Sequence, residues 1–294
     1  MQNTDYYVAK DTNSINYLVI NGKFPSDIKR IVTEQRVTKI ALRNENEDDL
    51  LKLDTIKDQL KVLTVDFPLS TTRHIPIMSE LRELYLNTVS QLELNKCNFP
   101  KLESFAISYP HKIASLKIEI PTLHKLVIFN GTKKLNSFLN CFNAIKVLSI
   151  RQSLLVSFED FEKFQDIGSL TMYKVNEIDN SHKISKLKNL HTLKIIMCKK
   201  FKDYKTIGDL SNLEILYLVD QGDIPNLAWV SDLSKLKEFI FSGKTNISDG
   251  KIQLLTYLNK LRQVSFEDRK HYDVNRKDLQ QKLALNSMKQ LKTE

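Results

Sequence analysis

Few side chains in this sequence are placed to do chemistry, and the best candidates form two groups. Cys198 lies seven residues after His191, which offers a thiol and an imidazole for nucleophilic catalysis. The run from Phe266 to Tyr272 gathers Glu, Asp, Lys and His, as an acid–base site requires. The chain contains no H-E-x-x-H, paired C-x-x-C, G-x-x-x-x-G-K-S/T or G-x-S-x-G motif, and its six His residues are dispersed. We therefore interpret Cys198 as buried filler and residues 266–272 as a capping turn, and we expect no enzymatic activity, metal or cofactor.

The elements that would position these side chains follow a tandem repeat. Apolar residues recur at offsets 0, +3 and +5 of a segment that returns every 21 to 25 residues. The twelve copies begin at Ile15, Val37, Leu60, Leu81, Leu102, Leu123, Ile145, Ile167, Leu190, Leu213, Leu236 and Leu261. Because side chains alternate along a strand, each copy predicts a short strand with these three offsets in a core and offsets +2, +4 and +6 facing outward.

These copies resemble the leucine-rich repeat family, and their spacing is similar to that of its bacterial, internalin-like members. The resemblance covers roughly residues 15–270. It implies an α/β solenoid, or horseshoe, with a concave parallel sheet of about twelve strands and a convex side of short strands and short helical turns. The family usually has Asn or Cys at offset +8, and of the residues found there only Cys198 fits. Those residues are Lys23, Glu45, Pro68, Val89, Pro110, Gly131, Ser153, Val175, Cys198 and Gln221.

The connections from one strand to the next are of two kinds. Repeats four and five carry a second alternating apolar run, which predicts extended returns. The residues are Leu92 and Leu94 in one, and Ile113, Leu116, Ile118 and Ile120 in the other. Repeats eight to ten instead place apolar residues three apart, as at Ile184 and Leu187, which predicts one or two helical turns.

The two ends are expected to differ from the middle, because a terminal repeat must cap the core. Residues 1–14 are mostly polar and are predicted to form an N-terminal cap, with the solenoid spanning 15–270. Residues 271–294 place Leu279, Leu283 and Met288 near helical spacing. They predict a C-terminal capping helix, and a detachable tail that binds a partner is the alternative.

Composition and cysteine usage indicate the compartment. The chain is 41% hydrophobic and 27% charged, as soluble folded proteins are. It has no signal-peptide pattern at its start and no apolar run long enough to span a membrane. Cys97, Cys141 and Cys198 have no paired spacing and are expected to be reduced thiols. We therefore expect a cytoplasmic bacterial protein, and a monomer.

With no catalytic site expected, function is predicted to lie on the outward offsets of the concave sheet. Repeats nine to eleven place apolar residues there, and contiguous exposed apolar surface with aromatic anchors marks a binding site. The predicted partner-binding residues are Ile196, Ile215, Tyr217, Val219 and Ile240, together with Lys194, Tyr173, Phe129 and Arg151. The alternatives are that Ile and Val are simply favoured in strands, or that a terminal segment covers them.

Charges of both signs flank this group, which favours a protein partner in the concave groove. The role would be that of an adaptor, a toxin-immunity or inhibitor protein, or an effector. The formal net charge of +9 keeps a second hypothesis open, namely binding of nucleic acid or another acidic surface. Nucleic acid is the less expected partner, because it would favour an unbroken basic stripe with stacking aromatics.

Overall fold

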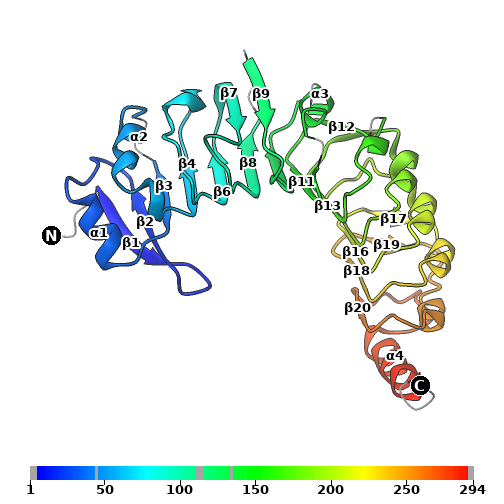
Figure 1. Ribbon diagram of the computed structural model, residues 1–294. Helices are drawn as coiled ribbons and strands as arrows, with labels where there is room; N and C mark the ends of the chain where they lie inside the picture. Colours follow the sequence, from blue (N-terminus) through cyan, green and yellow to red (C-terminus); the bar gives the residue numbers. More distant parts are fainter. Residues whose placement is uncertain are drawn as a thin grey trace. The chain divides into compact units, whose positions relative to one another are not determined.

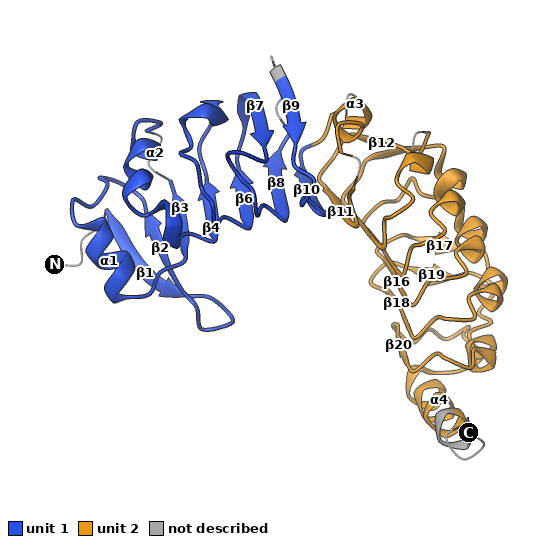
Figure 2. Cartoon of the chain, in the orientation of Figure 1, with its two compact units in different colours: residues 1–130 blue, residues 131–294 orange. Residues whose placement is uncertain are grey.

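The computed structural model describes residues 5–43, 46–109, 115–132, 135–142, 144–159 and 161–290. The chain divides into two compact units, residues 1–130 and 131–294 (Figure 2). In each unit the repeats contribute one strand apiece to a parallel sheet, and the chain returns along the opposite side of the unit (Figure 1). The fold of each unit is therefore that of an α/β solenoid.

The first unit has six parallel strands in the order β2-β3-β4-β6-β8-β10, with β1 antiparallel on the outer side of β2. Its elements are β1 (Tyr6–Lys10), β2 (Asn16–Ile20), α1 (Ile28–Glu34), β3 (Lys39–Leu42), α2 (Asp49–Lys52), η1 (Leu53–Thr55), η2 (Lys57–Gln59), β4 (Val62–Val65), β5 (Leu69–Thr71), η3 (Thr72–His74), β6 (Glu83–Leu86), β7 (Val89–Asn95), β8 (Ser104–Ser108), β9 (Ser115–Glu119) and β10 (Lys125–Phe129).

The second unit has parallel strands in the order β11-β13-β15-β16-β18-β20. Its elements are α3 (Leu135–Leu139), β11 (Val147–Arg151), β12 (Leu155–Ser157), η4 (Phe161–Lys163), β13 (Ser169–Tyr173), β14 (Glu177–Asp179), η5 (Ser181–Lys186), β15 (Thr192–Ile196), η6 (Tyr204–Asp209), β16 (Ile215–Val219), β17 (Asp223–Ile224), η7 (Ala228–Asp232), β18 (Glu238–Ser242), β19 (Asn246–Ile247), η8 (Gln253–Tyr257), β20 (Gln263–Ser265) and α4 (Arg276–Gln290).

The repeat pattern correctly predicts the sheet. Each of the twelve copies supplies one parallel strand, from β2 to β20, within the described residues. The apolar residues at offsets 0, +3 and +5 are buried in every copy except the first, where Ile15 is 39% exposed. The prediction that Ile15 faces the core is therefore wrong. This residue sits at the turn between β1 and β2, where its carbonyl accepts from the Asp11 N–H at 3.0 Å and no preceding repeat covers it.

The returns also follow the prediction. In repeats four and five they are extended, as β7 and β9, and with β5 they form a small parallel sheet. In repeats eight to ten they are the short 3₁₀ helices η5, η6 and η7. Ile113 lies outside the described residues. The difference follows the apolar spacing, since alternation by two suits a strand and spacing by three suits a 3₁₀ turn.

In the second unit one backbone conformation follows most of the strands. Gln152, Lys174, Met197 and Asp220, all at offset +7, have φ of 53°, 52°, 56° and 55°, which is the left-handed region. Each donates its backbone N–H to the last residue of the next strand, at 2.7 to 3.1 Å. A side chain in this region costs roughly 1–2 kcal/mol. The turn is tolerated because it extends the hydrogen-bond ladder between neighbouring repeats.

Polar side chains at offset +8 bond to the backbone in three of these four turns, although only one of them is the Asn or Cys expected, and Val175 occupies that offset in the fourth. Cys198 donates its thiol to the Ile196 carbonyl at 3.3 Å, while Ser153 Oγ accepts from the Gly131 N–H at 3.0 Å. Gln221 donates to the Ile195 and Val219 carbonyls at 2.9 and 2.7 Å from a buried position. Cys198 alone has the residue type that the family usually places here, and Ser153 and Gln221 bond to backbone groups of the turn from the same offset. Glu45 and Pro110 lie outside the described residues.

The two ends of the chain are built differently. At the N-terminal end β1 runs antiparallel to β2, with Tyr6 opposite Ile20 and Lys10 opposite Asn16. At the C-terminal end α4 packs against β20 and η8, and Leu279 and Leu283 on it are buried. The side chain of Met288 lies outside the described residues. The domain boundaries at residues 14 and 270 remain predictions.

The left-handed turn can be tested by replacing Gln152 with Gly. Relief of the strain, about 1–2 kcal/mol, exceeds the cost of the added freedom of Gly in the unfolded chain, about 0.5–1 kcal/mol. We expect a net stabilisation of about 0.5–1 kcal/mol, measured as a higher urea midpoint with an unchanged slope. Gln152→Val should lower the midpoint, because β-branched residues fit this region worst. Gln152→Ala controls for the loss of the side chain, and a lower midpoint for Gln152→Gly would contradict strain at this turn.

Candidate partner-binding face

Parallel register places the predicted binding residues in rows across the sheet of the second unit. Tyr173, Ile196 and Val219 occupy equivalent positions on neighbouring strands and form one row. Lys194, Tyr217 and Ile240 form the next row. Ile215 stands two residues before Tyr217, between Thr192 and Glu238. Neighbouring strands lie about 4.8 Å apart, so these side chains are in contact range across the rows.

We call Ile196, Ile215, Tyr217, Val219 and Ile240 the apolar patch. All five side chains are half-buried, so each retains a surface toward solvent. The terminal segment that could have covered them contains α4, which packs against β20 and η8. Each of the five side chains is flanked by neighbours on the adjacent strands, which cover part of its surface.

Tyr217 is held in one orientation from both sides. Lys194 Nζ lies 4.3 Å from the centre of the Tyr217 ring, a cation–π distance, and the Tyr217 hydroxyl donates to Glu238 Oε1 at 2.6 Å. The Glu238 carboxylate, aided by partial burial, raises the pKa of Tyr217 to about 12. The phenol therefore stays protonated near neutral pH and keeps donating. An aromatic ring fixed before binding loses less conformational entropy when a partner covers it.

The charges around the apolar patch are segregated. On the β11 to β15 side, Lys174 Nζ lies 5.3 Å from the Tyr173 ring centre, and Arg151 Nε donates to Ser149 Oγ at 3.1 Å. With Lys194 these make three cations. On the β16 to β18 side the carboxylates of Asp220 and Glu238 lie at or beside the sheet. A surface that is apolar in the centre and of opposite charge on its two sides gives a partner a defined orientation.

Eight of the nine predicted site residues lie in the second unit, and Phe129 lies in the first, at the end of β10 beside Ser108. The structure therefore groups Phe129 with a different sheet segment from the apolar patch. One residue that the sequence reading missed is Met197, which is 39% exposed and follows directly after Ile196. The sequence signal for its exposure was its position at offset +7, because the left-handed conformation at this offset directs the side chain out of the core.

The first unit contains a counterpart of the Tyr217 arrangement. Tyr85, at the same offset +4 of its repeat, donates its hydroxyl to Glu83 Oε2 at 2.6 Å. Burial and the Glu83 carboxylate raise the pKa of Tyr85. Its neighbours in the row are Thr64 and Ala106, so it is not surrounded by apolar side chains. The Tyr–Glu pair is thus shared by the two units, whereas the apolar patch belongs to the second.

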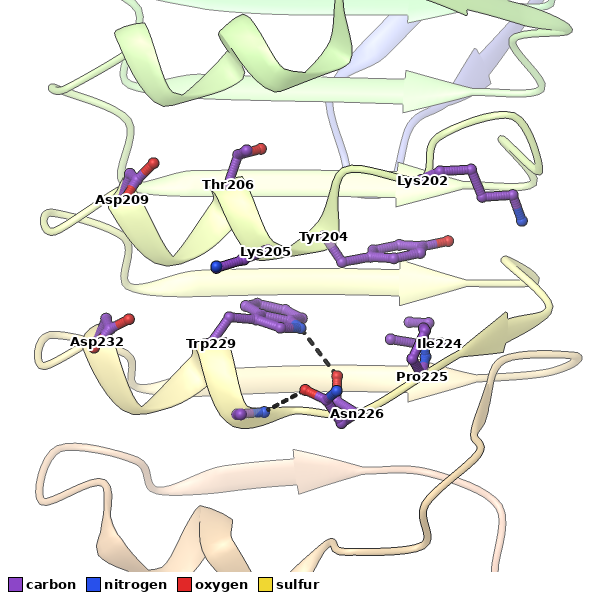
Figure 3. A pocket seen from close by; sticks show the side chains of 11 residues that line it. Lys202, Tyr204, Lys205, Thr206, Asp209, Ile224, Pro225, Asn226, Trp229 and Asp232 are labelled. Atoms are coloured by element: carbon purple, nitrogen blue, oxygen red, sulfur yellow. Dashed lines mark hydrogen bonds between the residues drawn. The ribbon is translucent and has the colours of Figure 1, made fainter.

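A groove of about 630 Å³ lies on the return side of the second unit, between η6 and η7 (Figure 3). Its floor holds Trp229 and Tyr204, which are only 7% and 3% exposed. The Trp229 Nε1–H donates to the Asn226 carbonyl at 3.1 Å, and Asn226 Oδ1 accepts from the Ala228 N–H at 3.1 Å. The rim is formed by exposed Lys and Asp side chains. Because its aromatic rings are already covered, the groove offers a ligand little apolar area to bury.

In the first candidate catalytic group the cysteine is buried, and in the second two side chains contact backbone carbonyls. Cys198 is fully buried, and burial raises the pKa of its thiol to about 11. His191 by contrast is exposed. In the segment 266–272, Arg269 donates to the Thr245 carbonyl at 3.1 Å and the His271 ring nitrogen lies 3.0 Å from the Ile247 carbonyl. Both side chains thereby bind the preceding repeat, as a capping turn requires.

In the part of the chain that the structure describes, no group of three or more His, Cys, Asp or Glu side chains is arranged to hold a metal ion. No helix in that part is long and apolar enough to cross a membrane.

Comparison with known proteins relates this chain to leucine-rich repeat structures. An internalin (InlF) from Listeria monocytogenes superposes with a TM-score of 0.50 at 16% identity, covering 88% of this chain and 84% of the internalin. The functional domain of InlJ from the same organism superposes with a TM-score of 0.50 at 14% identity, covering 86% of this chain and 58% of InlJ. No family model and no curated protein matches the sequence. At identities this low, the superpositions show a shared fold alone.

The position of Cys198 predicts its reactivity. At about pH 8 an aromatic disulfide reagent should label the exposed Cys97 and leave Cys198 unmodified, because the thiolate is the reactive form and burial disfavours it. Cys198 should become reactive only after unfolding in denaturant, as measured by mass spectrometry of the labelled peptides. Labelling of Cys198 in the folded protein as fast as Cys97 would instead support thiol chemistry at this site.

Proposed function

We propose that this leucine-rich repeat solenoid is a non-catalytic binding protein that holds a protein partner against the exposed sheet face of its second unit. The observation that carries the proposal is the apolar patch, with Tyr217 fixed between Lys194 and Glu238. Interfaces draw most of their affinity from a few aromatic and apolar residues near their centre. Tyr217 has that position, with Ile215 and Val219 on its own strand and Ile240 on the next.

A protein partner suits this face better than a nucleic acid does. The centre of the face is apolar, and cations and carboxylates stand on opposite sides of it. Several lysines are also paired with carboxylates, as Lys237 is with Glu214 at 2.7 Å and Lys101 with Glu80 at 2.6 Å. The cognate surface would be apolar, acidic where it meets Lys194 and Arg151, and basic where it meets Glu238.

For the cellular role we propose an adaptor, a toxin-immunity or inhibitor protein, or an effector in the bacterial cytoplasm. The three cysteines are free thiols, and Cys97 is exposed, which suits a reducing compartment. The internalins that share the fold come from a bacterium, and this likeness of architecture is the support for a bacterial origin. An adjacent toxin gene would single out the immunity role.

The proposed face is tested by capturing a partner and then measuring its affinity for variants. The intact wild-type chain is immobilised beside a blank matrix and exposed to native lysate, and a partner is a protein that the wild type retains and the blank matrix does not. Titration of that partner should show at least about a thirtyfold loss of affinity for Tyr217→Ala, since central aromatic anchors contribute about 2 kcal/mol or more. The matched control is Tyr85→Ala, which removes the same Tyr–Glu hydrogen bond from the first unit and should bind as the wild type does. Unchanged affinity in both Tyr217→Ala and Ile240→Asp would refute the assignment.

The second candidate function rests on the net charge of +9 and is tested by salt. If the attraction is only the non-specific effect of scattered lysines, binding to duplex DNA or RNA should be weak at about 20 mM salt and lost at about 150 mM. Fluorescence polarisation with labelled duplexes measures this. Submicromolar binding that persists at the higher salt would favour the nucleic-acid hypothesis over a protein partner.

A further inference from the structure

We propose that two copies of this chain associate through the free edge of β1, which pairs antiparallel with β1 of the second copy about a twofold axis at Val8. The inference concerns the first unit alone and does not depend on the partner-binding face. It replaces the monomer expected from the sequence.

The hydrogen bonds of the hairpin show which groups of β1 are available. Asp11 donates its N–H to the Ile15 carbonyl at 3.0 Å, and the Asp5 carbonyl accepts from the Asn21 N–H at 2.7 Å. In an antiparallel pair alternate residues bond to the neighbouring strand, so Tyr7 and Ala9 also face β2. The backbone N–H and C=O groups of the residues between them therefore point away from the sheet. These residues are Tyr6, Val8 and Lys10.

No described element uses those outward groups. β1 is the last strand of its sheet, with β2 on one side of it (Figure 1). Among the described residues no side chain bonds to the backbone of Tyr6, Val8 or Lys10. The strand also lacks the Pro or bulge with which proteins commonly block an edge. A row of unpaired groups of this kind is a template for another strand.

The opposite end of the chain shows how an edge is closed in this protein. Gln280 on α4 accepts from the Val264 N–H at 3.2 Å through Oε1, and donates to the Arg262 carbonyl at 2.6 Å through Nε2. One side-chain amide thus takes the place that a further strand would fill beside β20. The terminal strand β20 is covered, whereas no residue that the structure describes covers β1. This contrast identifies the edge of β1 as the one left for pairing.

The sequence of β1 is complementary to itself in one register. With the axis at Val8, each Val8 faces its copy, and Tyr6 of each chain faces Lys10 of the other. The two outward rows then meet as three hydrogen-bonded pairs, each of which exchanges two backbone bonds. Tyr6 opposite Lys10 brings a cation to an aromatic ring, and Tyr7, which is 44% exposed, stands opposite Ala9. A register centred on Lys10 would oppose two lysines. Twofold pairing also uses both free edges, so the assembly closes as a dimer.

The test is sedimentation velocity of the full chain from about 1 to about 300 μM. The wild type should shift toward twice the monomer mass as concentration rises. Val8→Pro should remain monomeric, because the ring removes an outward N–H while the inward bonds to β2 stay in place. Tyr257→Ala is the matched control, since it removes the most exposed large apolar side chain of the described chain and should dimerise as the wild type does.

The register is tested by exchanging the facing side chains. Tyr6→Lys opposes two lysines in each pair and should weaken the dimer at least tenfold. Adding Lys10→Glu to that variant should restore dimerisation, because each pair then joins a lysine and a carboxylate. A variant that failed to fold would not be rescued in this way, and circular dichroism verifies the fold. A wild type that stays monomeric throughout, a dimer insensitive to Val8→Pro, or a failure of the double variant to recover would each overturn the proposal.

Discussion

The structure depends on one constraint: no repeat can bury its own apolar side chains, so each must stack in register on the next. Leu213, Leu216 and Leu218 are fully buried only because equivalent residues of the adjacent copies lie above and below them. Stacking in register also aligns the outward residues, since side chains alternate along a strand. The rows of the exposed face follow directly from the packing of the core. This is how three consecutive repeats with outward apolar residues produce one continuous patch.

The same stacking explains the turns of the second unit. Extending the ladder past the end of a strand has two requirements: a left-handed residue at offset +7 and, in three of the four such turns, a polar group at offset +8 that satisfies buried backbone. Val175 occupies that offset in the fourth turn. The chain meets the first requirement with Gln, Lys, Met and Asp, although Gly would cost less strain. It meets the second with Ser153, Cys198 and Gln221 in place of an asparagine ladder. Geometry is therefore retained while residue identity varies.

The surface shows two ways of managing exposed strand groups. On the sheet face, Tyr217 has its hydroxyl satisfied by Glu238 and its ring covered in part by Lys194, so an apolar anchor is exposed without an unpaired polar atom. At the sheet edges, α4 satisfies the backbone of β20 through Gln280, whereas β1 carries no such cover among the described residues. The proposed partner-binding face and the proposed dimer edge of β1 are thus distinct surfaces: the first offers side chains, and the second offers backbone groups.

Apolar spacing was sufficient to predict the architecture, because the spacing of apolar residues is a local property of the sequence. It predicted the twelve parallel strands, the extended and 3₁₀ returns, and the outward apolar residues of repeats nine to eleven. Contacts between residues that are distant in sequence form only in the folded chain, and the sequence did not predict them. The bond of Ser153 to Gly131, the bond of Gln221 to Ile195, the fixing of Tyr217 by Lys194 and Glu238, and the closing of β20 by Gln280 all join residues 16 or more positions apart. A repeat pattern gives the direction in which a side chain points, but contacts across repeats decide whether its polar atoms are satisfied.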